Sequence, residues 1–330
     1  MDAVAGFGAC VEAHKMALVW LVLAGSFFAA LLAQRLPQLK PPSGTASLSF
    51  AGLFQDLIRY GKTKSGWQRP VGLQMFDVPK RWFYHFYVVS VTWNGFLLVL
   101  LIQSLLLSWP FPIWLQDLLT AVDGALQDKH RCTDSSVNGG ESLSAFLVCL
   151  FVWLNSCRRL RECLHISIFS NSVIHIVQYC FGLCYYVLVG LTVLCQVPAK
   201  VREGKDYQLT VCWYHVLGLM MFIWASLHQH RCHVILANLR KNKSGKVVNL
   251  DHSIPFGDWF EMVSCPHYLA ELLIYISMAI TFGLNNFTWW LVVAYVFFNQ
   301  AMSAVLSHEY YLSNFKHYPK CRKAYIPFLL

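Results

Sequence analysis

Hydrophobic residues gather into seven long runs along the chain. The runs lie at about 16–34, 84–109, 143–157, 173–197, 209–228, 268–283 and 288–307. A helix needs about 20 mainly apolar residues to cross the hydrocarbon core of a bilayer. The runs have that length or are slightly shorter. We therefore predict an all-α polytopic membrane protein, in which about seven transmembrane helices enclose a cavity. Residues 1–330 are expected to form a single integral-membrane domain.

The composition supports this class of protein. Hydrophobic residues make up 56% of the chain and charged residues only 13%, whereas a soluble domain carries about 25% charged residues. The formal net charge of +9 then indicates basic loops beside anionic lipid. The Lys and Arg clusters are not interleaved with aromatic residues as on a nucleic-acid-binding surface, so no nucleic-acid partner is expected.

The charges between the runs predict the orientation. On one side of the membrane, the three connections contain 8, 3 and 5 Lys and Arg residues and the C-terminal tail contains 4. The three connections on the other side contain 2, 3 and 0. The positive-inside rule therefore places the C-terminus in the cytosol. The third run, 143–157, is short, and we expect its helix to continue through the charged residues 158–162.

The most polar stretch, residues 229–271, joins two of the runs. Gln229, His233 and Arg240 are spaced by four and seven residues, which places them on one face of a helix. A basic face where a helix leaves the membrane suits an anionic ligand. Glu271 lies one turn inside the next run, where a carboxyl group requires a partner. The stretch is therefore expected to roof a site inside the bundle.

Simpler interpretations apply to several of these groups. Arg240 and its neighbours could be a positive-inside anchor, and the run KTK at 62–64 is interpreted as a solvated or lipid-facing loop. The histidines at 228, 230 and 233 lack a further Cys or carboxylate at ligand spacing that would complete a metal site, so no metal is expected. The absence of a Gly-x-Gly-x-x-Gly motif gives no support for a Rossmann domain.

The C-terminal sequence HEYYLSNFKHYPKCRKAYIPFLL resembles the end of the steroid 5-alpha-reductase family. That family ends in a Tyr-Pro-x-x-Arg-Lys-x-x-Ile-Pro-Phe pattern, matched here by Tyr318, Pro319, Arg322, Lys323, Ile326, Pro327 and Phe328. Five further stretches resemble its polyprenol (polyprenal) reductase branch: FQDLIRYGKTK (54–64), FDVPKR (76–81), VIHIVQYCFGL (173–183), CHVILANLRKNKSG (232–245) and HSIPFGDWFE (252–261). The resemblance covers nearly the whole chain beyond about residue 50.

The resemblance implies a multi-pass enzyme of the endoplasmic reticulum membrane. It would use NADPH to reduce the double bond of the α-isoprene unit of a long-chain polyprenoid, on the route to dolichol for protein N-glycosylation. Its partners would be this lipid substrate and the surrounding membrane lipid, and a weak steroid substrate is left open. Residues of about 143–330 would carry most of the cofactor site. Because hydride adds to a conjugated carbonyl but not to an allylic alcohol, the chemistry favours polyprenal over polyprenol as the direct substrate.

The resemblance also implies site residues. The expected cofactor-binding residues are Arg158, Arg159, Gln229, His233, Arg240, His252, Gly257, His267, His308, Tyr311, Arg322 and Lys323. Glu271 matches a Glu of the family and is expected at the catalytic centre. The steroid branch has a Tyr near the end of the third span where this chain has Ser156, and its earlier Glu has no clear counterpart. Ser156 and the nearest polar groups, Asp77, Tyr84 and His85, are therefore catalytic candidates, and the identity of the general acid stays open.

Two alternatives remain at this point. The first is reduction of 4-ene-3-oxosteroids, which needs the same cofactor and the same conjugated carbonyl. The second is a lipid transporter or scaffold, in which the polar stretch 229–271 would act as a gate. Transporters of this kind commonly contain inverted repeats and discontinuous helices, and no internal repeat is visible in the sequence.

Overall fold

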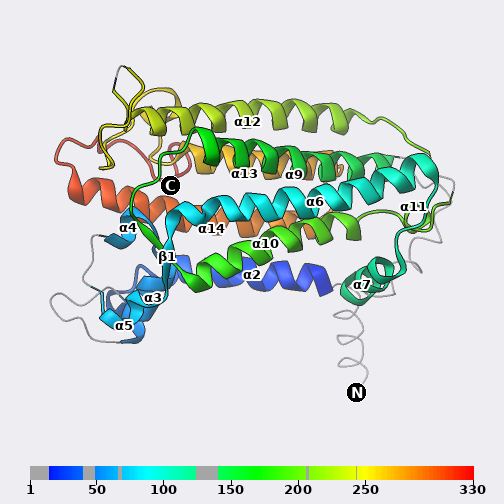
Figure 1. Ribbon diagram of the computed structural model, residues 1–330, viewed down its shortest axis with the longest axis horizontal. Coiled ribbons are helices and arrows are strands. Elements are labelled where there is room, and N and C mark those ends of the chain that lie inside the picture. Colours follow the sequence, from blue (N-terminus) through cyan, green and yellow to red (C-terminus); the bar gives the residue numbers. More distant parts are fainter. Residues whose placement is uncertain (1–14, 40–48, 66–68, 124–139, 206–207, 243) are drawn as a thin grey trace.

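The computed structural model describes residues 15–39, 49–65, 69–123, 140–205, 208–242 and 244–330. Seven long helices lie side by side along its longest axis (Figure 1). They are α2 (Lys15–Ala33), α6 (Phe83–Leu107), α9 (Gly140–His165), α10 (Ile176–Cys195), α12 (Trp213–Asn238), α13 (Pro266–Thr281) and α14 (Phe287–Asn314). Each corresponds to one predicted hydrophobic run, so the all-α class is confirmed. By length and composition, α2, α6, α9, α10 and α14 can cross a membrane, which makes the protein multi-pass.

Small residues set how closely these helices approach. A Cβ atom on Gly218 of α12 would lie 2.9 Å from the carbonyl oxygen of Ser277 on α13. A Cβ atom on Gly190 of α10 would lie 2.9 Å from Leu97 of α6. Close backbone contact of this kind stabilises helix pairs in lipid, where no hydrophobic force drives them together.

The helix α9 runs to His165, so the predicted extension through residues 158–162 is confirmed.

The connection between α2 and α6 is more structured than the predicted loop. It contains η1 (Pro37–Leu39), α3 (Phe50–Ile58), α4 (Lys62–Ser65), α5 (Val71–Gln74), β1 (Asp77–Pro79) and η2 (Lys80–Trp82). The strand β1 pairs antiparallel with β2 (Val173–His175), with Asp77 opposite His175. This pairing fixes the connection against the end of the bundle where α10 begins (Figure 1). Two short helices, α7 (Ile113–Asp123) and α11 (Ala199–Arg202), lie at the opposite end.

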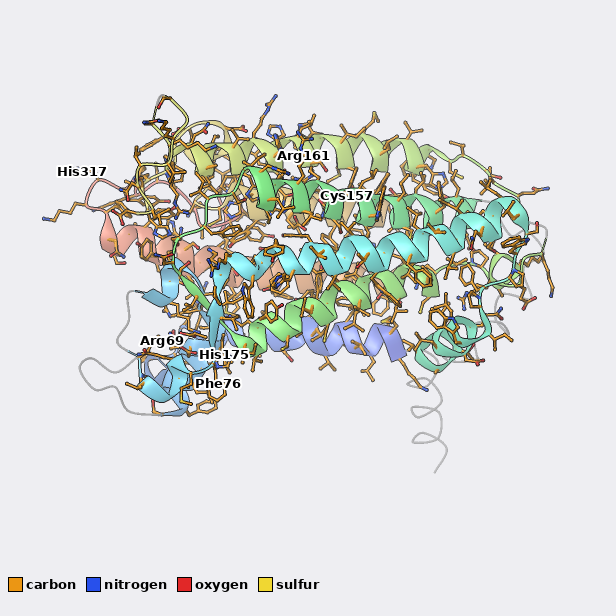
Figure 2. All side chains as sticks on the ribbon, viewed as in Figure 1. Arg69, Phe76, Cys157, Arg161, His175 and His317 are labelled. Carbon is orange, nitrogen blue, oxygen red and sulfur yellow. The ribbon has the colours of Figure 1, made fainter. Side chains whose placement is uncertain are left out.

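A buried ion cluster formed by Asp56, Lys64, Arg69 and Asp77 holds this connection together. The Lys64 ammonium lies 3.0 Å from a carboxylate oxygen of Asp56 and 3.1 Å from one of Asp77. Arg69 bridges the same two carboxylates at 2.5 and 2.6 Å, and Figure 2 labels it at the same end of the molecule as His175. The interpretation of residues 62–64 as a solvated loop is therefore wrong, because opposite charges on nearby segments allow Lys64 to be buried.

The C-terminal tail folds back onto the segment that precedes α13. Lys323 forms a parallel bridge with Val263, and its carbonyl accepts a hydrogen bond from the Ser264 amide at 2.8 Å. The Arg322 side chain is buried and donates to the Pro255 carbonyl at 2.8 Å. Its guanidinium lies over the ring of Phe256. This segment also contains η3 (Asp258–Glu261), and the tail covers it from one side.

Candidate active site

A cavity of about 670 Å³ lies inside the bundle. Residues from α2, α6, α9, α10, α12, α13 and α14 line it, together with the connection between α2 and α6. This volume lies within the range of ordinary ligand sites. The residues at one end of the cavity are mainly cationic, and those further along the helices are mainly aromatic.

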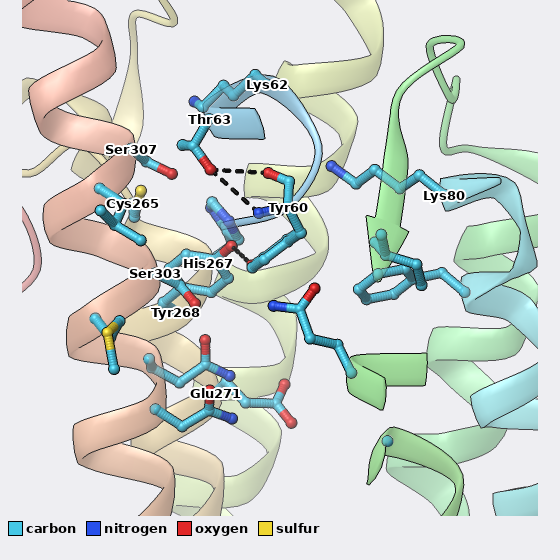
Figure 3. A pocket seen from close by; sticks show the side chains of 18 of the residues that line it. Tyr60, Lys62, Thr63, Lys80, Cys265, His267, Tyr268, Glu271, Ser303 and Ser307 are labelled. Atoms are coloured by element: carbon cyan, nitrogen blue, oxygen red, sulfur yellow. Dashed lines mark hydrogen bonds between the residues drawn. The ribbon is translucent and has the colours of Figure 1, made fainter. Parts of the chain in front are cut away.

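We call the cationic end of the cavity the polar mouth. It lies beside the α2–α6 connection and the C-terminal end of α12. It is lined by Lys62, Lys80, Arg159, Arg240 and His252, and Figure 3 shows the two lysines on the side of the α2–α6 connection. The aromatic interior lies further along the helices. Its lining includes Phe27, Phe181, Tyr185, Tyr275 and Tyr295. One continuous cavity therefore joins a cationic opening to a largely apolar space.

The three residues of the predicted polar face of α12 meet at the cavity. Gln229, His233 and Arg240 all line the cavity, although the helix ends at Asn238 and Arg240 lies just beyond it. Arg240 donates a hydrogen bond to the carbonyl of Ile168, which holds the guanidinium at the polar mouth. Its Nη2 atom lies 3.4 Å from Nε2 of His252, so the guanidinium and this ring lie together at the mouth.

The partner that Glu271 requires is Gln229. The Gln229 amide donates to the Glu271 carboxylate, and its oxygen accepts a hydrogen bond from Arg158. Arg158 and Arg159 both pair with Glu162, which is only 1% exposed. A chain of alternating donors and acceptors thus runs from α9 through α12 to α13, and it fixes Glu271 in the cavity wall.

Two other predicted cofactor residues line the cavity near this network. The Nδ1 atom of His267 is shielded from solvent and has no hydrogen-bond partner in the described part of the chain. Tyr311 lies beneath the Lys62 ammonium, which is 3.7 Å from the centre of its ring. An unpartnered buried nitrogen and a group of cations are the features that a polar, anionic cofactor would satisfy.

Burial controls the charge of two groups at the polar mouth. Removal from water lowers the pKa of Lys62 to about 8, with a smaller contribution from the neighbouring Arg240 charge. Burial lowers the pKa of His252 to about 4, assisted by the charges of Lys62 and Arg240. At neutral pH the His252 ring is therefore uncharged, and the lysine and arginine side chains supply the positive charge of the mouth.

Lys62 and Lys80 are lining residues that the sequence reasoning missed. Both belong to stretches that carry the family resemblance, 54–64 and 76–81, and this is the signal that could have found them. Basic residues in a connection next to a membrane more often anchor it to lipid. Tertiary contacts, among them the pairing of β1 with β2 and the ion cluster, bring this connection to the cavity.

Four of the five catalytic candidates do not line the cavity. Ser156 is buried against α6, where its hydroxyl lies 2.6 Å from that of Ser90. Asp77 belongs to the ion cluster. His85 is hydrogen-bonded to a tyrosine of α10, and the ring of Tyr84 packs beside it. Glu271 is the candidate that the structure brings into the cavity.

Five of the predicted cofactor residues do not line the cavity: Arg158, Gly257, His308, Arg322 and Lys323. The His308 ring is 2.6 Å from the Ser264 hydroxyl, and Ser264 itself lines the cavity. Gly257 has a φ of +91°, a conformation that favours glycine, and it immediately precedes η3. These residues support the segments that line the site.

Comparison with known proteins identifies the family. Residues 170–330 match the family described as 3-oxo-5-alpha-steroid 4-dehydrogenase. The chain is 59% identical to a Homo sapiens protein named polyprenal reductase over 322 residues, which cover 96% of each chain. It is 58% identical to a protein of the same name from Ailuropoda melanoleuca over 96% of each chain. It is 48% identical to the protein named polyprenal reductase from Danio rerio, over 95% of this chain and 97% of the relative. The chain therefore belongs to the steroid 5-alpha-reductase family of oxidoreductases.

Proposed function

We propose that this protein is a polyprenal reductase that uses NADPH to saturate the α-isoprene double bond of a long-chain polyprenal, on the route to dolichol for protein N-glycosylation. The observation that carries the proposal is the single cavity that joins a cationic mouth to an aromatic interior. The names of the relatives supply the substrate class.

The polar mouth fits the cofactor. Lys62, Lys80, Arg159 and Arg240 provide positive charge for its phosphate groups, and the free Nδ1 of His267 offers a further polar contact. When bound, NADPH supplies a hydride to the β-carbon of the conjugated aldehyde. The protein itself binds and orients both reactants, excludes water and supports the charge that develops on the aldehyde oxygen.

The aromatic interior suits the isoprenoid chain. Phe27, Phe181 and Tyr295 offer apolar ring faces to a lipid. The aldehyde head of such a chain would then lie toward the polar mouth, near Glu271. A free polyprenol has no carbonyl to accept the electrons of the double bond, so the aldehyde is the substrate that this chemistry favours.

The proposed location is the endoplasmic reticulum membrane, with the C-terminus in the cytosol. The excess of Lys and Arg on the side that holds the tail supports this orientation. The polar mouth then opens toward cytosolic NADPH. We treat the chain as one domain, because the cavity is lined both by α2 and the α2–α6 connection and by α12, α13 and α14.

NADPH oxidation by the purified protein in detergent tests the proposal. Polyprenal, polyprenol and a 4-ene-3-oxosteroid are offered in parallel, and turnover is expected with polyprenal. Turnover with the steroid alone would instead assign the protein to steroid reduction. No turnover and no NADPH binding would refute the enzymatic proposal and favour a transporter or scaffold.

Two variants link the activity to the cavity. Arg240→Ala is expected to weaken NADPH binding by roughly ten- to a hundredfold, because a hydrogen bond to a charged group contributes about 1.5–3 kcal/mol. Glu271→Gln is expected to lower the turnover rate. Arg161→Ala is the matched control for the arginine, since Arg161 is exposed and lies away from the cavity lining on α9 (Figure 2).

A further inference from the structure

Two tyrosine hydroxyls meet inside the cavity. Tyr60 comes from the connection between α2 and α6, and Tyr268 comes from the first turns of α13. Their oxygen atoms are 2.5 Å apart, and both residues line the cavity (Figure 3). The pair therefore bridges two segments that are 208 residues apart in the sequence.

The position of the pair lies between the two regions of the cavity. Tyr60 is two residues before Lys62 of the polar mouth, and Tyr268 is three residues before Glu271 on the same helix. Tyr275, which belongs to the aromatic interior, follows two turns further along α13. A lipid chain held in the interior would therefore bring a polar head group to these hydroxyls.

The pair has a hydrogen-bond donor to spare. Two phenol groups carry two O–H bonds, and only one of them is used when one hydroxyl donates to the other. Ser303 of α14 also hydrogen-bonds with Tyr60. When Ser303 and Tyr268 both donate to the Tyr60 oxygen, the Tyr60 O–H is the one left to donate to a substrate oxygen. Burial raises the pKa of Tyr60 above its ordinary value, so this hydroxyl stays protonated at neutral pH.

We propose that the Tyr60–Tyr268 pair donates the hydrogen bond that polarises the aldehyde oxygen and supports its negative charge during reduction. This assignment rests on the proposed function and supplies the donor that the sequence left open. The tyrosine whose free O–H touches the substrate is the catalytic residue. The other is a positioning residue that strengthens this donor by hydrogen bonding to it.

Reduction of the conjugated aldehyde consists of a hydride addition followed by a proton addition. Hydride forms a C–H bond at the β-carbon, the π electrons of the C=C bond move between the α-carbon and the carbonyl carbon, and the carbonyl π electrons move to oxygen. The hydrogen bond from the pair stabilises this enolate. A proton taken up from bulk solution through the polar mouth then adds to the α-carbon, and the carbonyl re-forms, so that one hydride and one proton are consumed. The tyrosines end the cycle unchanged.

A second tyrosine pair provides an internal comparison. The hydroxyls of Tyr185 and Tyr275 are 2.6 Å apart, and both residues also line the cavity. Their rings pack within the aromatic interior, where Tyr185 contacts Tyr295 at a centroid distance of 5.4 Å. The two pairs share the same chemistry but differ in their distance from the polar mouth.

The test measures NADPH-dependent polyprenal reduction by Tyr60→Phe, Tyr268→Phe and the double variant. Each single change is expected to lower kcat by about 10²–10³, the usual loss for one oxyanion donor. KM for polyprenal, the Kd of NADP⁺ and the melting temperature should change little, because the rings remain. The double variant should be no slower than the slower single variant, since the two hydroxyls act as one unit.

Two control variants sharpen the result. Tyr185→Phe is expected to lower kcat by less than about tenfold, as its hydroxyl is remote from the head group. Tyr179→Phe removes a hydroxyl that is bonded to His85 outside the cavity and should leave the rate unchanged.

The outcomes separate this assignment from the proposed function. Wild-type activity in both Tyr60→Phe and Tyr268→Phe, or an equal loss in Tyr185→Phe, would overturn the assignment alone. A wild-type protein that binds no NADPH and reduces no polyprenal would overturn the proposed function and this assignment with it. If Tyr268→Phe fails to fold, Tyr60→Phe provides the same test from outside the transmembrane helices.

Discussion

Replacing Lys64 by methionine tests whether the buried ion cluster holds the α2–α6 connection in place. The side chains of Lys64 and Asp56 are fully buried, and Asp77 is 12% exposed. Methionine keeps much of the length of the side chain but removes its positive charge. Arg69 alone then faces two carboxylates, and one buried negative charge is left without compensation.

The expected cost follows from this imbalance. Removing one partner of a buried ion pair destabilises a protein by about 3–5 kcal/mol. Because Arg69 still pairs with both carboxylates, the lower end of that range, about 3 kcal/mol, applies. At roughly 2–4 °C per kcal/mol for chains somewhat smaller than this one, Lys64→Met should lower the melting temperature by about 6–12 °C.

Thermal unfolding in detergent, followed by tryptophan fluorescence, measures this change. Lys205→Met is the matched control, because Lys205 forms an ion pair with Glu203 while its side chain is 68% exposed. Surface pairs contribute less than about 1 kcal/mol, so the control should melt close to the wild type. Equal melting temperatures for the two variants would refute the structural role of the cluster.

Two further predictions concern the polar mouth and the tail. Since the pKa of Lys62 is about 8, its positive charge is lost as the pH rises through that value, and NADPH affinity should fall between pH 7 and 9. Lys62→Met should bind more weakly and with a smaller pH dependence, because Lys80 still lines the mouth, and a wild-type affinity that is constant over this range would contradict the role of Lys62. Arg322→Ala removes the hydrogen bond to the Pro255 carbonyl, so trypsin should cut after Lys323 severalfold faster. The exposed Arg231→Ala serves as its control, and unchanged cleavage in Arg322→Ala would show that Arg322 does not hold the tail.

The sequence by itself determined the helices and part of the site. The seven helices follow from local composition, because a bilayer demands about 20 apolar residues in each span. The helical repeat placed Gln229, His233 and Arg240 on one face, and the cost of an intramembrane carboxylate implied a partner for Glu271. These inferences depend on neighbours within a few turns, so no knowledge of the fold was needed.

Only the tertiary structure decided which distant residues meet. Local sequence makes Lys64 a solvated lysine, yet its contacts with Asp56 and Asp77 bury it. The sequence makes Ser156 a catalytic candidate, but the approach of α9 to α6 turns its hydroxyl toward Ser90. The contact between Tyr60 and Tyr268 spans 208 residues. Such contacts depend on how helices and strands pack after their connections close, and the periodicity of a single segment contains no information about that packing.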